Sequence, residues 1–407
     1  MERRDTPNSV TRLLHPAAAG DSPLPVARAV KAGDLVFSGG CVAADERGRV
    51  RALGDVRAQA DAIFRAIADI VAAAGGTLSD VMSLTSFHAD PRSVEEVFAV
   101  GREYFRDQFP AWTPVGFVGC QHAGALLQIR AVASVGSGPK ECYVPDSLRW
   151  LRRYPVSAAC KKGELVFVSG QSGADADGHQ EVPLDHCGQA RRAYDRIVEL
   201  VELAGGTLDD VLDFTSFHLD IRGAVETLEK VYIPDVMGPI HADDSATTSH
   251  LGATGLLTPD TWGVYSAIAD LAPGRRVGST PDSIWWKGEY PIAGAAMKQH
   301  GRLVTVAGQV ASAPNDRNAV LHSGDIAAQA RFVFESIRDA LAGFGVTLAN
   351  VVEVISFHKD PRHWNTVMSV ASEFFDPANP PAWTFSGVTG LWVEGYQHEI
   401  AALAITE

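Results

Sequence analysis

Residues 85–90 read TSFHAD, residues 215–220 read TSFHLD, and residues 355–360 read ISFHKD. A second pattern, Asp-x-x-x-Gln-Ala, precedes each copy, at 55–60, 185–190 and 325–330. In all three copies its glutamine precedes the histidine of the six-residue stretch by 29 residues. Successive copies begin 130 and 140 residues apart, much further than solenoid repeats, so we expect three duplicated domains that each possess a core.

Each copy predicts the same order of elements. In the first, an extended run over 35–41 and a turn precede an amphipathic helix that Asp55 caps and Gly75 ends. The strand containing Ser-Phe-His follows, and a second helix starts at Asp90-Pro91. A strand pair closes the unit at 129–133. The order is ββαβαββ, an α+β fold with helices on one sheet face. The bare faces of three sheets can bury one another around an axis, which predicts an intramolecular pseudo-trimer.

The repeat positions predict the domain organisation. We expect an N-terminal tail over 1–23, domains over 24–135, 154–271 and 290–407, and linkers over 136–153 and 272–289. Both linkers contain Pro-Asp-Ser followed by tryptophan, at Trp150 in the first and at Trp285 and Trp286 in the second. Large aromatic side chains there predict packed straps rather than flexible tethers.

Composition restricts the class of protein. A net charge of −14 over 407 residues and a pI near 5.4 disfavour nucleic acid as a partner. No apolar run is long enough for a membrane span or a signal peptide, and the five cysteines show no Cys-x-x-Cys spacing, so a cytoplasmic protein is expected. No nucleotide, flavin or haem motif is present, so we expect chemistry without a cofactor.

The ordered motifs resemble the Rid/YjgF family of reactive intermediate deaminases. They include Ser-Gly-Gln at 169–171, the Asp-x-x-x-Gln-Ala helix start, AGGTL at 74–78, Pro-Ala-Trp-Thr at 110–113 and the closing strand. The resemblance covers 24–135, 154–271 and 290–406. It implies chorismate-mutase-like domains in a ring, with ligand sites in the three clefts between neighbours. It also implies hydrolysis of enamines and imines to release ammonia, which protects pyridoxal-phosphate enzymes.

Three positions depart from what the resemblance implies. The family arginine that grips a substrate carboxylate is replaced by Trp112, Thr248 and Trp383 in the three copies. The family glutamate that orders the attacking water is matched by Glu399, and its equivalents are Gln128 and Val264. The glutamine of Ser-Gly-Gln is Gln171 or Gln309, and Cys41 in the first copy. We therefore expect unequal clefts and one or two working sites, foremost in the cleft that contains Glu399.

The sequence assigns provisional roles to these residues. Glu399, at a partly dry interface beside Trp383, is expected to have a raised pKa and to act as a general acid or base; the alternative is a solvated charge at a strand end. Trp112 and Trp383 would supply stacking surface. His250 follows Thr248 in an unusual segment, 238–255, that also contains His241, Asp243 and Asp244. This segment either lines the cleft, with His250 assisting, or forms a polar turn.

The repeated histidines, His88, His218 and His358, each stand two residues after a serine and two before an aspartate. Residues i and i+2 of a strand are about 6.6 Å apart, so a serine–histidine hydrogen bond is not expected. A structural role at the start of the next helix is favoured over substrate binding. A metal would require the histidines to meet on the axis, and we predict none.

The leading functional prediction is a cofactor-independent Rid-like hydrolase or deaminase. Its substrate would be a small aromatic or cyclic metabolite, bound in a cleft without the family arginine. The enzyme would act on a C–N or enol bond of this metabolite. One alternative is a chorismatase-like enol-ether hydrolase, which would need basic residues for a dicarboxylate. The other is a non-catalytic small-molecule-binding or scaffold protein. The assembly is expected to be a monomeric pseudo-trimer or a loose homo-oligomer.

Overall fold

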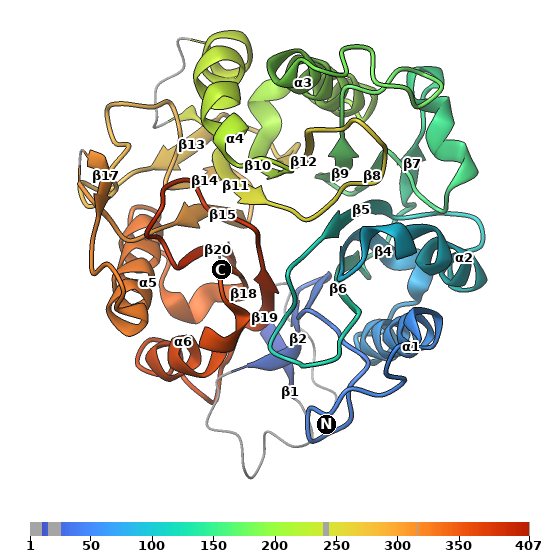
Figure 1. Cartoon of the computed structure of the whole chain (residues 1–407), viewed down its shortest axis with the longest axis horizontal. Coiled ribbons are helices and arrows are strands. Elements are labelled where there is room, and N and C mark those ends of the chain that lie inside the picture. The colour runs from blue at the N-terminus through green and yellow to red at the C-terminus, as the bar shows by residue number, and fades with distance from the viewer. Residues whose placement is uncertain (1–9, 15–25, 239–243, 315, 407) are drawn as a thin grey trace.

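The computed structural model describes residues 10–14, 26–238, 244–314 and 316–406. Three similar units surround one central axis, with helices on the outer rim and strands inside (Figure 1). We call them repeats 1, 2 and 3 in chain order. Among the described residues, no helix has the length and apolar character needed to cross a membrane.

Each repeat has the predicted ββαβαββ order. Repeat 1 contains β2 (Ala27–Ala32), β3 (Leu35–Ser38), α1 (Val56–Ala73), β4 (Val81–His88), α2 (Val94–Tyr104), β5 (Ala111–Gly116) and β6 (Leu127–Ser134). Repeat 2 contains β8 (Ala159–Lys162), β9 (Leu165–Gln171), α3 (His186–Leu203), β10 (Val211–His218), α4 (Arg222–Thr227), the π-helix η6 (Leu228–Met237), β11 (Thr247–Gly252) and β12 (Gly263–Asp270). Repeat 3 contains β14 (Ala295–Lys298), β15 (Leu303–Gln309), α5 (Ile326–Ala342), β18 (Val351–His358), α6 (Trp364–Ala371), β19 (Ala382–Gly387) and β20 (His398–Ile405).

Short elements complete the chain outside this common order. Strand β1 (Val10–Leu14) pairs with β2, the hairpin of β16 (Ser312–Ala313) and β17 (Asp316–Val320) follows β15, and the linkers contain β7 (Glu141–Tyr143), η4 (Asp146–Arg153) and β13 (Arg276–Ser279). The 3-10 turns η2 (Leu78–Asp80), η5 (Leu208–Asp210) and η8 (Leu348–Asn350) lead into β4, β10 and β18. The turns η3 (Pro91–Ser93) and η9 (Pro361–His363) start α2 and α6. In the second linker, Trp285 and Trp286 are buried, as expected for a packed strap.

The recurring helix-start motif has a structural explanation. The Asp55 carboxylate accepts a hydrogen bond from the Ala58 N–H and caps α1, and Asp185 and Asp325 cap α3 and α5 in the same way. Gln59 is fully buried: its amide donates to the Gly124 carbonyl, and its carbonyl accepts from the Leu126 N–H. The aspartate thus fixes the start of the helix, and the glutamine attaches it to the loop before the last strand.

The three sheets share one strand order. In repeat 1 the order is β2-β3-β6-β4-β5, with β5 parallel to β4, and the corresponding strands of repeats 2 and 3 repeat it. Each sheet meets the next through a matching backbone hydrogen bond, in which a residue before or at the start of the first strand donates to the preceding repeat. The donor–acceptor pairs are Ala27 to Pro381, Ser157 to Pro110 and Ala293 to Ala246, at 2.9, 3.0 and 3.2 Å.

The phenylalanines of the three Ser-Phe-His stretches meet at the axis. Phe87, Phe217 and Phe357 contact one another with ring centroids 6.2, 6.4 and 6.0 Å apart, in edge-to-face arrangements. All three side chains are buried. The predicted pseudo-trimer is therefore confirmed, with the inner sheet faces turned toward one another.

Candidate active site

Three junctions join each repeat to its neighbours. Ser249 on β11 accepts a hydrogen bond from the Gly308 N–H on β15, and Thr113 on β5 accepts from the Gly170 N–H on β9. At the remaining junction, the Gly40 N–H donates to the Trp383 carbonyl. The cleft that contains Glu399 is therefore formed with repeat 2, and it faces Thr248 rather than Trp383.

A small cavity occupies this cleft between repeats 2 and 3. Its lining is mostly apolar and is supplied by β11, η6, the second linker and the last repeat. The lining residues are Leu228, Thr248, His250, Trp285, Trp286, Ile292, Gly308, Val310, Trp392 and Glu399. The structure thus brings the two residues expected to be catalytic, Glu399 and His250, into one cavity. Their catalytic roles stay a prediction.

Glu399 is a buried acid. It pairs with Phe357 in the sheet register, and its side chain lies over Gly308, where an added Cβ would come within 2.0 Å of the carboxyl oxygen. A glycine at this point makes room for the carboxyl group. Burial raises the pKa of Glu399 to about 8, against the opposing effect of a backbone hydrogen bond from His250. At neutral pH the side chain is therefore mainly a protonated acid.

His250 presents one ring nitrogen to the cavity. Its Nδ1 lies 2.7 Å from the Ser216 hydroxyl, so Nε2 points away from Ser216, and it is buried without a hydrogen-bond partner among the described residues. Burial lowers the pKa of His250 to about 4, which keeps the ring neutral at neutral pH. The indole nitrogen of Trp285 is also buried and unpartnered in the described part of the chain. Two nitrogen atoms of the lining are thus available to form hydrogen bonds with a ligand.

The tryptophans of the cavity differ from those expected. Trp285, Trp286 and Trp392 supply the aromatic surface. Residues 285–286 read Trp-Trp where residues 149–150 of the first linker read Arg-Trp. The extra tryptophan in the second linker could have indicated a role in the site. The sequence interpretation instead assigned both linkers the same structural role.

The expected stacking roles of Trp112 and Trp383 are wrong. Trp112 is buried against Phe64 and Phe98 beneath its own helices, and its indole donates to the Ser86 hydroxyl at 2.8 Å. Trp383 donates to Ser356 at the same distance and packs in the core of repeat 3. Side chains alternate between the two faces of a strand, and the register places Trp112 and Trp383 on the helix-covered face, whereas Glu399 pairs with Phe357 on the inner face.

The expectation that serine and histidine would be too far apart is also wrong. Ser86 Oγ lies 2.8 Å from His88 Nε2, and Ser216 Oγ lies 2.9 Å from His218 Nε2. The imidazole bends back along the strand, so the distance between the backbones does not limit the contact. His88, His218 and His358 are fully buried, and His358 instead stacks on Phe385 with ring centroids 3.7 Å apart.

The remaining expected site residues divide between the cavity and its surroundings. Thr248 lines the cavity. Gln171 and Gln309 donate to backbone carbonyls of their own strands, at Ser169 and Ala307. Asp244 is exposed and pairs with Arg275, while His241 and Asp243 lie outside the described residues. Over the described residues, no group of three or more histidine, cysteine or acidic side chains is arranged to hold a metal ion.

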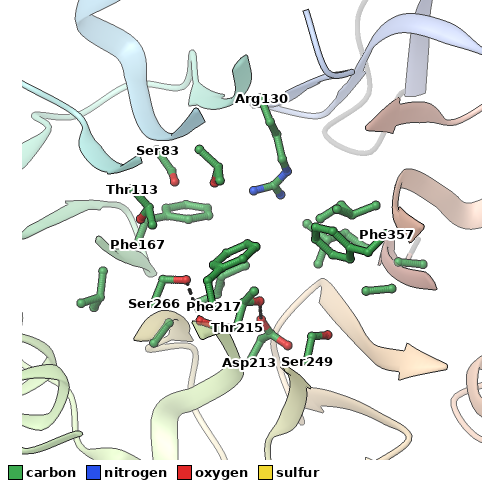
Figure 2. A pocket seen from close by; sticks show the side chains of 18 of the residues that line it. Ser83, Thr113, Arg130, Phe167, Asp213, Thr215, Phe217, Ser249, Ser266 and Phe357 are labelled. Atoms are coloured by element: carbon green, nitrogen blue, oxygen red, sulfur yellow. Dashed lines mark hydrogen bonds between the residues drawn. The ribbon is translucent and has the colours of Figure 1, made fainter. Parts of the chain in front are cut away.

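A second cavity is lined by residues of all three repeats, among them Phe87, Phe217 and Phe357 (Figure 2). Arg130 projects toward it and binds Glu353 through two contacts of 2.6 Å. Asp213 accepts hydrogen bonds from Thr215 and Thr247, and burial raises its pKa to about 6. The charged groups of this cavity thus have partners within the protein. The cavity between repeats 2 and 3, with its unpartnered nitrogens and buried acid, is the better candidate active site.

The fold and its cleft define a chain of three fused Rid-type domains around one axis. The chain belongs to the family described as Endoribonuclease L-PSP, whose model matches residues 20–135, 149–243 and 293–406. These three matches confirm the resemblance to Rid/YjgF proteins that the sequence motifs indicated.

Similar proteins support the same assignment. The RutC family protein YjgH of Escherichia coli is 34% identical over 111 residues, which cover 27% of this chain and 80% of that protein. The 3-aminoacrylate deaminase RutC of Acinetobacter baylyi is also 34% identical over 111 residues, covering 27% of this chain and 87% of its own. A solved chorismatase structure aligns with 80% of this chain and 93% of its own at a TM-score of 0.51 and 12% identity, which shows a shared fold alone.

Proposed function

We propose that this protein is a cofactor-independent hydrolase that cleaves the C–N bond of a small, uncharged imine or enamine. The reaction would take place in the cavity between repeats 2 and 3. One observation carries the proposal: the buried carboxyl group of Glu399 shares the cavity with a neutral histidine whose Nε2 has no partner among the described residues. A buried acid with a pKa near the working pH is suited to general acid–base catalysis.

The proposed chemistry passes protons through the Glu399 carboxyl group in both directions. Protonated Glu399 gives its proton to the imine nitrogen while water adds to the imine carbon, forming a C–O bond as the C=N π pair moves to nitrogen. The carboxylate then takes a proton from the added oxygen. Glu399 then returns a proton to nitrogen, and the C–N bond breaks with its electron pair going to nitrogen as the hydroxyl oxygen forms the C=O bond. The carboxylate takes the hydroxyl proton, which leaves a carbonyl compound, ammonia or an amine, and protonated Glu399. His250 Nε2, which has no partner among the described residues, would hydrogen-bond the water or the leaving nitrogen.

The lining favours an uncharged substrate. Among the described lining residues there is no lysine or arginine, so a carboxylate would enter without a cationic partner. This differs from what the name 3-aminoacrylate deaminase implies for that relative, whose substrate carries a carboxylate. It also disfavours a chorismatase-like reaction on a dicarboxylate. Trp285, Trp286 and Trp392 provide apolar surface for an aromatic or cyclic body.

Imines made in place by an oxidase test the proposal. An amine oxidase acting on benzylamine supplies an uncharged aromatic imine, and an amino-acid oxidase acting on leucine supplies an anionic one. The imine that remains is trapped with semicarbazide and measured by absorbance. We expect this protein to accelerate loss of the uncharged imine and to affect the anionic one less.

Glu399→Gln is the decisive variant in that assay. Gln128 occupies the equivalent strand position in repeat 1, so a glutamine fits this site in the fold. Loss of the acid should lower kcat by about 10²-fold or more, whereas Gln128→Glu, in another cleft, should leave it unchanged. Binding of the aromatic compound without any acceleration by the wild type would instead support the non-catalytic alternative.

A further inference from the structure

We propose that a proton path crosses repeat 2, from His186 at the surface through His218 and Ser216 to His250 in the cavity. The inference rests on the proposed function, because the path would bring protons to the cavity that contains the buried acid. Glu399 is 4% exposed, and a ligand in the cavity would cover it further. When the released ammonia takes the Glu399 proton and leaves as ammonium, that turnover removes a proton that the site must recover.

The path is a continuous row of hydrogen bonds. His186 Nε2 lies 3.3 Å from His218 Nδ1, and His218 Nε2 lies 2.9 Å from the Ser216 hydroxyl. That hydroxyl lies 2.7 Å from His250 Nδ1. His250 Nε2 then has no partner in the described structure, in a ring that lines the cavity. His218 and Ser216 are buried, whereas His186 is half-buried.

The row can transfer a proton without leaving a charge inside. With all rings neutral, His186 Nε2–H donates to His218, and His218 Nε2–H donates to Ser216. The Ser216 hydroxyl has two acceptors within reach, the Ser249 carbonyl at 3.2 Å and the nearer His250 Nδ1 at 2.7 Å, and in the path it donates to His250. When His250 Nε2–H gives its proton to the cavity, each group passes its own proton along the row. His186 then takes one at Nδ1 from water. Each ring changes tautomer and stays neutral, as expected because burial lowers the pKa of all three imidazoles.

Repeats 1 and 3 lack this connection to their clefts. In both, the serine hydroxyl accepts a hydrogen bond from a core tryptophan, Trp112 or Trp383. The residue that corresponds to His250 in the strand register is Pro114 in repeat 1 and Phe385 in repeat 3. In repeat 2, Thr248 takes the place of the tryptophan and leaves the Ser216 hydroxyl available to His250.

The outer end of the path is likewise special to repeat 2. The helix position of His186 is Val56 in repeat 1 and Ile326 in repeat 3. His186 occupies space above Gly223, where an added Cβ would come within 1.8 Å of the ring. The corresponding residues are Ser93, which binds His88 Nδ1, and His363. Four differences therefore lie along one line that ends at the cavity containing Glu399.

The surface end is built to exchange protons with water. His186 stacks on Trp262 with ring centroids 6.0 Å apart, which holds the ring in place beside His218. Burial lowers the pKa of His186, and the nearby carboxylates Glu226, Asp220 and Asp185 oppose that effect. This end therefore accepts a proton more readily than the fully buried rings.

The first experiment compares Ser216→Ala with Ser86→Ala, which removes the corresponding hydroxyl from repeat 1. Imine hydrolysis is followed as above, in mixtures of light and heavy water. We expect Ser216→Ala to lower kcat about tenfold or more with KM unchanged. In the wild type, a plot of kcat against the deuterium fraction of the solvent should be curved, and in Ser216→Ala it should be linear. Ser86→Ala should leave both unchanged. Equal kcat values and equally curved plots for the two variants would overturn the proposal.

The second experiment removes the surface end, which does not touch the cavity. His186→Ala should lower kcat about tenfold, and added imidazole should restore it in a saturable manner. His179→Ala, at an exposed histidine of the same repeat, should do neither. A loss in His186→Ala that imidazole does not restore would assign His186 a structural role and contradict the path.

Failure of the path can be separated from failure of the proposed function. If the wild type hydrolyses no imine, the proposed function fails, and the tautomer of His250 is then read by nitrogen NMR of labelled protein. The path requires that Ser216→Ala and His186→Ala change the His250 tautomer populations while Ser86→Ala and His179→Ala do not. Unchanged spectra in all four variants would overturn it.

Discussion

At the scale of single residues, the environment decides what an acid does. Glu399, Gln128 and Val264 hold the same strand position in the three repeats. Glu399 lies over Gly308 and beside the backbone of repeat 2, so its carboxyl group is removed from water. The raised pKa that suits it to donate a proton is also a destabilising feature, and this can be measured.

Glu399→Gln should change the pH dependence of stability. An acid whose pKa is higher in the folded protein stabilises the fold fully below its unfolded pKa and loses that contribution as the pH rises toward the folded value of about 8. Relative to the variant, the wild type should lose up to about 1.4 kcal/mol of unfolding free energy per pH unit between about pH 5 and pH 8. Urea titrations of both proteins measure the difference. A difference that stays constant with pH would mean that the carboxyl group is solvated.

At the scale of elements, the second linker supplies both structure and site. Trp286 donates its indole hydrogen bond to the Ile292 carbonyl at 2.9 Å, while the adjacent Trp285 has no partner for its own among the described residues. The two rings contact each other in an edge-to-face arrangement. Trp286 thus stabilises the linker, and Trp285 leaves an unused hydrogen-bond donor in the lining of the cavity.

Replacing each tryptophan by phenylalanine separates these two roles. Trp286→Phe leaves a carbonyl unpaired and should lower stability by about 0.5–1.5 kcal/mol. Trp285→Phe removes a donor that is already unpaired, so stability should stay the same or rise, while a ligand that accepts from this nitrogen should bind more weakly. Thermal unfolding with and without benzamide as the probe measures both effects. Equal losses of stability in the two variants would contradict this division of roles.

The sequence predicted the elements better than the site. Residues such as Asp55 and Gly75 define helix ends through local backbone chemistry, so the repeat pattern was sufficient to predict ββαβαββ. Glu399 and His250 were recognisable because they depart from the other repeats. The strap tryptophans and the serine–histidine contacts depend on side-chain direction and on segments distant in sequence, which spacing alone does not determine. His186 was missed because it directly follows a helix cap and looks like a surface residue.

At the scale of the whole molecule, fusion into one chain lets each junction differ. Equivalent positions of the inner strands hold Ser83, Asp213 and Glu353 in the three repeats. On the neighbouring strands, another set of equivalent positions holds Arg130, Ser266 and Ala401, which pair in register with Thr85, Thr215 and Ile355. A chain with identical repeats would place three like charges around the axis. Here one arginine from repeat 1 neutralises one glutamate from repeat 3, and both are buried.

The pair of Arg130 and Glu353 should therefore connect two repeats in an all-or-none manner. Removing either partner leaves a buried charge, and we expect Arg130→Ala or Glu353→Ser to cost about 3–5 kcal/mol each. These substitutions introduce residues that equivalent positions already hold, so the fold can accept their shapes. The double variant removes both charges together and should cost much less than the two losses combined.

A double-mutant cycle in urea measures this coupling. The exposed pair of Arg331 and Glu373 in repeat 3 is the control, and its alanine variants should cost about 1 kcal/mol or less. Additive losses at Arg130 and Glu353 would show that water reaches the axis and solvates each charge separately. Strong coupling would mean that repeats 1 and 3 separate only when the whole central cavity opens. In that case the junction between repeats 2 and 3 can tolerate buried polar atoms without hydrogen-bond partners. The contacts at the axis would hold the three repeats together independently of that junction.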